Sequence, residues 1–420
     1  MSPNLHRRTA PTSVASTALA FFIGVAGPAV IGYSRPQPQS AAPTPGQDSQ
    51  TGQNRSRPFA PGKCGPVDPT YIRTANLSGG MPMFLRPTEL SQVSSLIGAG
   101  LAANSDGVLW ATEKLTGQPR VFEVPIDSTV KKANFAFSFD TQGITVKLFR
   151  PSGTAVGSGD QGVEIGEWQC GRIFNLTAPE TGIWRIQIAG PGTYWAKAQV
   201  SSEIFFVSVE FVRPGGRPGH EGLFKIPGQP LAGKKETLRA SFSGKIKTAE
   251  FKLVSESGAS LRKLGMRETG SDPEDHEYLG IAAFPEQLFR LLVTGLDSNG
   301  ARYQRTYLTS FRATTLEVEP FHVPEELRPG SKTTVAFRIR NIGQPASFQV
   351  VAVDDHGFVT RGNSNQLVLE QGAAATVEVD LAVPAATPPG TGVTLTLAAT
   401  SISDPDITNG TVVDLTVAGP

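Results

Sequence analysis

Five histidines are the side chains of this chain best suited to bind zinc or to transfer protons near neutral pH. They are His6, His220, His276, His322 and His356, and none belongs to a His-Glu-x-x-His pattern. A zinc site that can be recognised from sequence needs ligands at short, fixed spacing. The Gly-x-Ser-x-Gly elbow of serine hydrolases and the P-loop are also missing from the sequence. We therefore predict a non-enzymatic protein with no catalytic, metal-binding or cofactor-binding residues; a site assembled from distant residues is the alternative.

One glycine-rich segment matches a motif of nucleotide chemistry. Residues 157–162 fit Gly-x-Gly-x-x-Gly, the fingerprint of dinucleotide-binding proteins. The fingerprint binds pyrophosphate only where a strand turns into a helix whose N-terminus faces the ligand. Residues 164–168 follow it without helical periodicity. We predict a loop here and no nucleotide site.

A second segment gathers carboxylates. Residues 272–277 read Asp-Pro-Glu-Asp-His-Glu, and calcium prefers such oxygen ligands. The segment lacks the alternating spacing and the bidentate closing ligand of an EF-hand loop. We predict a solvated acidic loop.

The charge of the chain is uneven along its length. The formal net charge is only +1, which argues against nucleic acid as the principal partner. Basic residues dominate residues 213–267, whereas acidic residues dominate the C-terminal hundred. Our candidate patch for an anionic partner consists of Lys234, Lys235, Lys245, Lys247, Arg262 and Lys263. On one sheet face they would attract an anionic polysaccharide or an acidic protein; ordinary solvated surface and contact with the acidic C-terminal module are the alternatives.

The two cysteines, Cys64 and Cys170, concern stability more than catalysis. In an oxidising compartment we expect them to form one disulfide, which in the chain-entropy model contributes about 4 kcal/mol. Two separate buried thiols are the alternative. No Cys-x-x-Cys spacing is present, so we predict no thiol-redox role.

The N-terminal segment indicates export. Basic residues at 6–8 precede an uncharged apolar stretch at 14–33, so residues 1–34 are predicted to be a signal peptide, or a signal anchor if they are not cleaved. Residues 35–63 are rich in Pro, Gln and Ser and are predicted to form a disordered linker. We expect a secreted or extracytoplasmic protein, periplasmic or at the cell surface, that meets a membrane only through such an anchor.

A short helical segment is predicted for residues 64–104. A helix over 69–77 ends at Gly79 and Gly80, and residues 81–85 are expected to form a strand. Thr88 caps a second helix, in which Leu90, Val93 and Ile97 recur at helical spacing.

From Arg120 onward the hydrophobic period changes to two. Short strands separated by Gly and Pro turns continue to the end of the chain, as β-sandwiches require. Pro and Gly at 213–219 indicate a break. We predict a mainly β protein of tandem immunoglobulin-like or fibronectin-like sandwiches over 105–213, 220–313 and 315–420, preceded by the short helical segment.

Part of the sequence resembles a known arrangement. Residues 68–80, with Phe84, Glu89 and Leu90, resemble the closing helix, Gly-Gly turn, last strand and last helix of a von Willebrand factor A domain. The stretch with Phe122 and residues 125–130, 151–153 and 182–184 resembles the module that follows that domain in hemicentin-like extracellular proteins. The resemblance spans 64–212 and implies β-sandwiches, an extracellular location, and adhesion or matrix association. The Asp-x-Ser-x-Ser metal motif of the A domain is missing, so no metal-dependent adhesion site is implied.

Three functional hypotheses follow. The first is an adhesion or interaction protein that binds an extracellular or envelope protein, or a polysaccharide, and no nucleic acid. The second is an accessory carbohydrate- or substrate-binding region of a secreted enzyme system, which a row of exposed aromatics would favour. The third is a hydrolase with an unrecognised site. N-glycosylation sequons begin at Asn76, Asn175 and Asn409.

Overall fold

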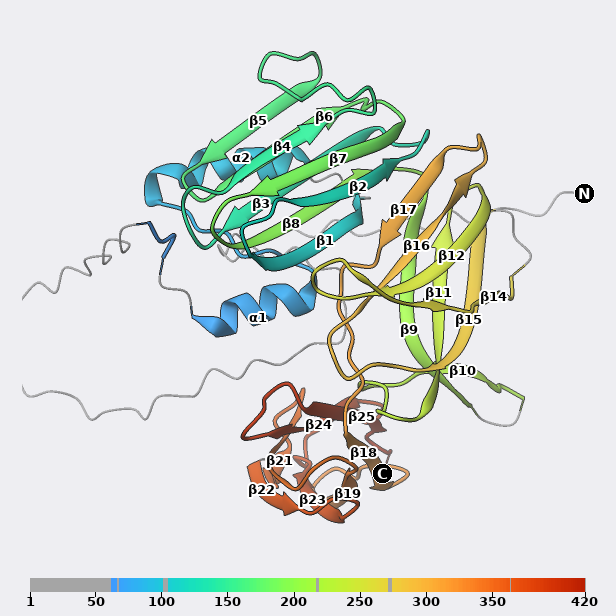
Figure 1. Cartoon of the computed structure of the whole chain (residues 1–420). Coiled ribbons are helices and arrows are strands. Elements are labelled where there is room, and N and C mark those ends of the chain that lie inside the picture. The colour runs from blue at the N-terminus through green and yellow to red at the C-terminus, as the bar shows by residue number, and fades with distance from the viewer. Residues whose placement is uncertain are drawn as a thin grey trace, which may run out of the picture.

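The computed structural model describes residues 62–65, 68–100, 105–216, 219–270, 274–362 and 364–419. The predicted export segment 1–34 lies outside these ranges, as does the predicted linker except Gly62 and Lys63. The described chain forms three β-sandwiches preceded by short helices, which confirms the predicted fold class (Figure 1). None of the helices in these ranges is long and apolar enough to cross a membrane.

The helical segment begins with α1 (Pro69–Ser78). The Asp68 carboxylate caps it by accepting a hydrogen bond from the Thr70 amide at 2.8 Å, and it ends at Gly79, whose φ of 74° is left-handed. The 3₁₀-helix η1 (Pro87–Glu89) leads into α2 (Leu90–Gly100). The predicted strand at 81–85 is wrong, because this stretch pairs with no sheet edge. Its side chains pack on a sheet face instead, with Phe84 5.6 Å from the Trp195 ring.

Sandwich 1 contains the first eight strands, all antiparallel. One sheet has the order β1-β8-β3-β6-β5 and the other the order β2-β7-β4. The bounds are β1 (Ser105–Leu115), β2 (Arg120–Ile126), β3 (Lys132–Phe139), β4 (Thr145–Phe149), β5 (Val163–Trp168), β6 (Gly171–Thr177), β7 (Gly182–Ala189) and β8 (Gly192–Ser201).

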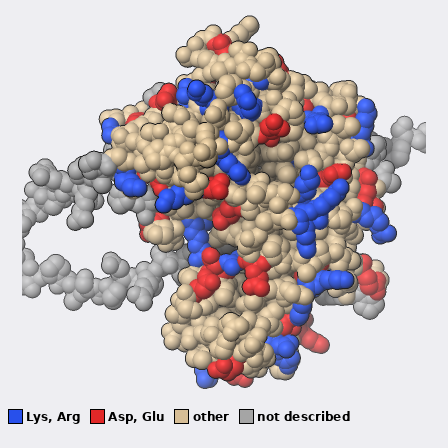
Figure 2. Space-filling view, in the orientation of Figure 1, with Lys and Arg blue, Asp and Glu red and all other residues tan. Residues whose placement is uncertain are grey.

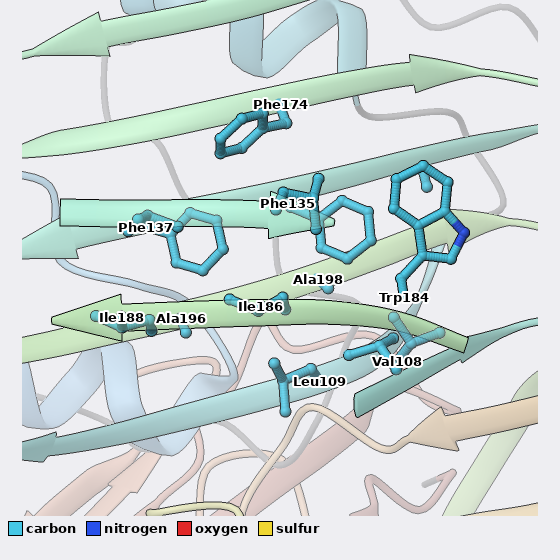
Figure 3. Close-up of a cluster of buried hydrophobic side chains, with 14 of the residues drawn as sticks. Val108, Leu109, Phe135, Phe137, Phe174, Trp184, Ile186, Ile188, Ala196 and Ala198 are labelled. Atoms are coloured by element: carbon cyan, nitrogen blue, oxygen red, sulfur yellow. The ribbon is translucent and has the colours of Figure 1, made fainter. Parts of the chain in front are cut away.

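The core of sandwich 1 follows from strand alternation. Phe135 and Phe137 on β3 face Trp184 and Ile186 on β7, and all four are fully buried (Figure 3). The Phe135 and Trp184 rings stack with centroids 6.1 Å apart. Fully burying a side chain of this size stabilises the fold by roughly 1.5–3 kcal/mol.

The outer face of the larger sheet is apolar too, and the helical segment covers it. Trp110, Trp168 and Trp195 form a second cluster there with Val93 and Leu96 of α2. The predicted disulfide is present: Cys64 and Cys170 are bonded, which ties the start of the described chain to sandwich 1.

Sandwich 2 contains β9 to β17. Its sheets have the orders β10-β9-β11-β15-β14 and β13-β12-β16-β17. The bounds are β9 (Phe205–Gly215), β10 (Gly222–Lys225), β11 (Lys235–Ser243), β12 (Ile246–Val254), β13 (Ser260–Leu264), β14 (Arg267–Glu268), β15 (Asp275–Ala283), β16 (Arg290–Asp297) and β17 (Arg302–Thr306).

The structure corrects one predicted boundary. The first sandwich was predicted to run over 105–213, with its last strand near 205–211. That strand is β9, and it pairs with β11 and β10 of sandwich 2. The Pro- and Gly-rich stretch read as a break connects the paired strands β9 and β10 within sandwich 2. Sandwich 1 therefore ends near Ser201, where β8 ends.

Sandwich 3 contains β18 to β25. Its sheets have the orders β18-β19-β23-β21 and β22-β20-β24-β25. The bounds are β18 (Leu316–His322), β19 (Lys332–Asn341), β20 (Ala346–Asp354), β21 (Val359–Arg361), β22 (Ser364–Leu369), β23 (Ala374–Ala382), β24 (Gly392–Ser401) and β25 (Thr408–Thr416).

Candidate functional site: the basic residues and the intermodule junction

The six residues of the candidate basic patch do not gather on one face. Lys234 and Lys235 lie at the start of β11, in one sheet of sandwich 2, whereas Lys247 and Lys263 belong to β12 and β13 of the other sheet. Lys263 pairs across the ladder with Lys252, five residues beyond Lys247 on β12. At about 3.3 Å per residue, Lys247 and Lys263 are roughly 17 Å apart along the strand.

Several of these cations already have partners. Lys245 contacts Glu274 at 3.1 Å and Lys263 contacts Glu250 at 3.2 Å, while the Arg262 guanidinium donates to the Ala283 carbonyl. Figure 2 shows both charge signs interspersed over the visible face of the molecule. A smaller group of basic residues, Lys252, Lys263 and Arg302, lies on the outer face of the β13-β12-β16-β17 sheet.

Some basic residues of sandwich 2 form ion pairs with acidic residues of sandwich 3. The Lys234 ammonium lies 2.7 Å from the Glu317 carboxylate of sandwich 3. The Arg213 guanidinium lies 2.8 Å from Glu236 and 3.9 Å from Glu319. The charge contrast seen along the sequence thus serves, at these positions, as a contact between sandwiches 2 and 3.

A buried ion pair joins sandwiches 1 and 2. The Arg305 guanidinium on β17 donates to the Asp127 carboxylate at 2.7 Å, and both side chains are fully buried. Arg305 also donates to the Ile204 carbonyl at 2.7 Å and to the Ser202 hydroxyl at 2.5 Å. Asp127 accepts two further bonds from the amide and hydroxyl of Thr129. Both charges are thus compensated in a site that excludes water.

A second polar contact between sandwiches 1 and 2 lies beside this pair. The Asp297 carboxylate accepts from the Ser128 amide at 3.0 Å and the Ser128 hydroxyl at 2.6 Å. The Asn299 side chain donates to the same hydroxyl at 2.8 Å. Although burial opposes it, these hydrogen bonds hold the pKa of Asp297 below its usual value.

A third contact brings in helix α1. The Arg290 guanidinium of β16 stacks 3.5 Å from the centre of the Trp110 ring and donates to the carbonyls of Leu308 and Asn76. The Asn76 side chain accepts from the Trp195 indole at 3.2 Å and donates to Glu256 at 3.5 Å. Burial lowers the pKa of Arg290 and raises that of Glu256.

Leu308 shows how closely these parts approach. Its side chain lies against Gly79 at the end of α1 and against Gly107 on β1, and a Cβ on either glycine would clash with it. Gly79 additionally needs its left-handed φ of 74° to end the helix. Glycine is therefore required at the meeting point of α1, sandwich 1 and sandwich 2.

Helix α1 also reaches sandwich 3. The Arg73 guanidinium lies 2.6 Å from the Asp406 carboxylate, which Arg312 of sandwich 2 contacts at 3.2 Å. The Asn409 side chain accepts from the Gln229 amide at 2.8 Å and donates to the Leu316 carbonyl at 2.7 Å. We call the Asp127–Arg305 pair, the Ser128–Asp297 contact, the Arg290 contacts and these contacts of sandwich 3 the intermodule junction; together they join α1 and all three sandwiches.

Two half-buried groups near the junction have strongly shifted pKa values. Burial raises the pKa of Asp106 to about 6, although the Arg305 charge and hydrogen bonds from the Phe206 and Gly107 amides oppose the shift. Burial lowers the pKa of Lys197 to about 8, and the Arg290 charge adds to the effect. The Phe206 amide of β9 donates to the Asp106 carboxylate of β1 at 2.9 Å, so we assign Asp106 to the contact between sandwiches 1 and 2.

The sequon asparagines Asn76, Asn175 and Asn409, which lie within the described residues, all use their side chains inside the fold. Asn175 accepts from Asn134 at 2.6 Å and donates to the Leu96 carbonyl of α2 at 3.0 Å. The bonds of Asn76 and Asn409 belong to the junction. A glycan on any of these amide nitrogens would displace a structural hydrogen bond.

The segments with possible chemistry are structural where they are described. Residues 157–162 form a turn leading into strand β5, and the Asp160 carboxylate in it accepts from the Gly157 amide and the Arg150 guanidinium. Asp272 and Pro273 of the predicted acidic loop lie outside the described residues, whereas Asp275, His276 and Glu277 begin strand β15 and do not form a loop, and His276 is buried. Within the described ranges, no group of three or more His, Cys, Asp and Glu side chains is placed to hold a metal ion.

The exposed aromatics bear on the carbohydrate hypothesis. Among the described residues the large exposed aromatics are Tyr71, Phe224 and Phe321. They lie on α1, β10 and β18, so they form no row on a single sheet face.

Sequence reasoning missed the junction. Arg305 occupies the same strand phase as the core residue Tyr303, so a charge at a core-facing position was the available signal. Its partner Asp127 lies 178 residues away in another sandwich, and no local pattern connects the two.

Comparison with known proteins defines the class of the chain. Residues 318–419 match the family model described as the VWA7 Ig-like domain, so sandwich 3 is similar to an immunoglobulin-like module of that kind. The predicted resemblance is confirmed: the chain is similar to von Willebrand factor A domain-associated proteins with Ig-like modules.

Among the relatives is von Willebrand factor A domain-containing protein 7. The chain is 24% identical to the Rattus norvegicus protein over 84% of this chain and 40% of that one, and 25% identical to the Homo sapiens protein over 78% and 38%. It is 22% identical to Mus musculus Hemicentin-1 over 62% of this chain and 5% of that protein. The chain thus spans about two fifths or less of the length of these relatives.

Proposed function

We propose that this chain is an exported, non-enzymatic protein that binds another macromolecule, in adhesion or matrix association, through a rigid array of three sandwiches. The observation that carries the proposal is the intermodule junction. Its buried ion pair and its contacts from α1 hold the modules in one arrangement, so loops on different sandwiches keep fixed spacing. Similarity to Hemicentin-1 supports the extracellular setting.

The binding mode expected of such an array is recognition of a surface. Two depressions in the described chain lie among neighbouring strands, one lined by Glu164 and Asn175 and the other by Phe321 and Glu378. Stable protein–protein recognition uses roughly 800 Å² of surface per partner, which the faces and loops of linked sandwiches can supply.

The test follows the full chain in its source cells. We expect tagged protein outside the cytoplasm and retained with the cell-surface or matrix fraction. Arg305→Leu should be exported but retained less, because it loosens the junction without altering an exposed surface. The exposed-pair variant Lys131→Ala is the matched control, since the Lys131 side chain is 72% exposed and forms an ion pair with Glu203 at 3.3 Å. Wild-type protein confined to the cytosol, or released with no retention, would contradict the proposal.

A second candidate is an accessory region that binds an anionic polysaccharide. Lys252 and Lys263 are cross-strand partners on the outer face of the β13-β12-β16-β17 sheet, and Arg302 extends that face. We expect Lys252→Glu/Lys263→Glu to abolish binding to dextran sulfate at low salt, while Lys147→Glu/Arg185→Glu on sandwich 1 leaves it unchanged. Equal binding by both variants would refute this candidate.

A further inference from the structure

Strand β22 (Ser364–Leu369) differs from every other edge strand of the described sheets. The remaining eleven edge strands each contain at least one charged residue, whereas β22 reads Ser-Asn-Gln-Leu-Val-Leu. Charged side chains on an edge discourage pairing with another chain, and exposed apolar edges invite it. The strand therefore lacks the usual protection of a sheet edge.

The strand also presents apolar surface to solvent. Val368 is 75% exposed, the largest fraction among the exposed large hydrophobic residues of the described chain. Its cross-strand neighbour on β20 is Ser347, whose carbonyl accepts from the amide of Ile402, a residue itself 52% exposed. Val368 and Ile402 thus flank Ser347 on opposite sides of β20, with Val368 on the open edge.

The sheet face next to this edge is uncharged. The outward-facing positions of β20 and β24 nearest to β22 are Ser347, Gln349 and Val351, and Ala398 and Thr400. On the inner side Leu369 is buried and Leu367 is partly buried against the core of sandwich 3. A strand added to β22 would extend both faces without burying a charge.

We infer that β22 pairs antiparallel with β22 of a second copy of this chain. A two-fold pairing of a strand with itself sets residues of the same segment opposite one another. Cross-strand neighbours lie about 4.5–5.5 Å apart, so like charges there are destabilising. Self-pairing of β13 about its central residue would set Arg262 of one copy opposite Arg262 of the other. Strand β22 escapes this repulsion.

Self-pairing joins the two β22-β20-β24-β25 sheets into one continuous eight-stranded sheet across the dimer axis. Outward-facing residues must lie opposite outward-facing residues, so Gln366 and Val368 of one copy meet the same pair of the other. The inference concerns self-association and does not depend on the proposed function.

Sedimentation equilibrium of the full chain over a wide concentration range tests the pairing. We expect wild-type protein to form a reversible dimer and Gln366→Lys/Val368→Lys to dimerise at least tenfold more weakly. Ile281→Lys is the matched control, because Ile281 is 68% exposed but lies on β15, between two neighbouring strands. It should dimerise like wild type.

A charge-swap experiment separates repulsion from misfolding. Mixing the double lysine variant with Gln366→Glu/Val368→Glu should restore association as a heterodimer, with hydrogen exchange of the β22 amides slowed in the mixture. Wild-type protein that stays monomeric at every concentration, or a double lysine variant that dimerises as tightly as wild type, would overturn the inference. So would binding of β22 to an unrelated extended peptide in place of a second copy.

Discussion

The buried pair Asp127–Arg305 gives the most demanding test of the junction. Replacing Arg305 with Leu removes the charge partner of Asp127 and the bonds to Ser202 and Ile204. Asp127 keeps only its two bonds from Thr129, in a site fully closed to solvent. Breaking such a pair from one side costs about 3–5 kcal/mol, because the remaining charge stays buried.

The assay exploits the distribution of tryptophans. All four, Trp110, Trp168, Trp184 and Trp195, lie in sandwich 1, so tryptophan fluorescence follows the unfolding of that module. We expect Arg305→Leu to lower the urea midpoint of this signal by an amount equivalent to about 3–5 kcal/mol. The effect should appear although Arg305 belongs to sandwich 2, because the pair crosses the module boundary.

A double-mutant cycle isolates the interaction. Asp127→Asn removes the buried charge, so the double variant should be more stable than the sum of the single losses predicts, with a coupling energy of about 2–3 kcal/mol. The exposed pair of Lys131 and Glu203 is the internal standard, since its side chains are 72% and 65% exposed and such pairs contribute at most about 1 kcal/mol. A coupling below about 0.5 kcal/mol for Asp127 and Arg305 would refute the reasoning.

Three further predictions follow from particular side chains. The folded pKa of Asp106, about 6, lies above the ordinary value of 3.8, so the folded protein holds a proton that the unfolded chain has released. The unfolding free energy should fall by up to about 3 kcal/mol from pH 4 to pH 7 through this group, measured as the difference from Asp106→Asn; parallel pH profiles would contradict it. Folded protein secreted from a glycosylating host should carry no glycan on Asn76, Asn175 or Asn409, and a glycopeptide found at any of these three sites by peptide mass spectrometry would show otherwise. Replacing Cys64 and Cys170 with Ala should cost about 4 kcal/mol, which denaturant unfolding against wild type measures; equal stability would argue against the role of the disulfide.

The parts of the fold that local pattern decides were predictable. Alternation along residues such as Phe135 to Phe139 fixes one face as apolar, and turn residues between strands fix their approximate ends. The boundary between the first two sandwiches was not predictable in this way. Residues 202–204 contain neither Gly nor Pro, whereas the Gly-rich stretch after Arg213 leads into strand β10. The Pro- and Gly-rich composition predicted a module boundary at 213–219, where the chain turns between β9 and β10, whereas the boundary between sandwiches 1 and 2 lies at residues 202–204.

The candidate site shows a second limit. A count of basic residues between 213 and 267 cannot tell which strand of which sheet carries each one, because strand order is set by long-range pairing. The structure therefore places Lys235 and Lys263 in different sheets, and it pairs Lys234, just before β11, with Glu317 of the next module. The junction could not be predicted for the same reason, since its partners lie in different modules and far apart in the sequence.

The chemistry of the junction explains why its arrangement is specific. An apolar interface tolerates small rotations, whereas a buried polar group that loses its partner costs about 1–3 kcal/mol, and a charged group costs more. Rotating sandwich 2 against sandwich 1 would separate Arg305 from Asp127 and Arg290 from Asn76 at once. The contact of Arg73 with Asp406 adds sandwich 3 to the same constraint. If β22 pairs as inferred, two such rigid chains are joined at a fixed angle. Both copies would then bind a partner with repeated sites at the same time. A flexible chain of modules would not provide the same avidity.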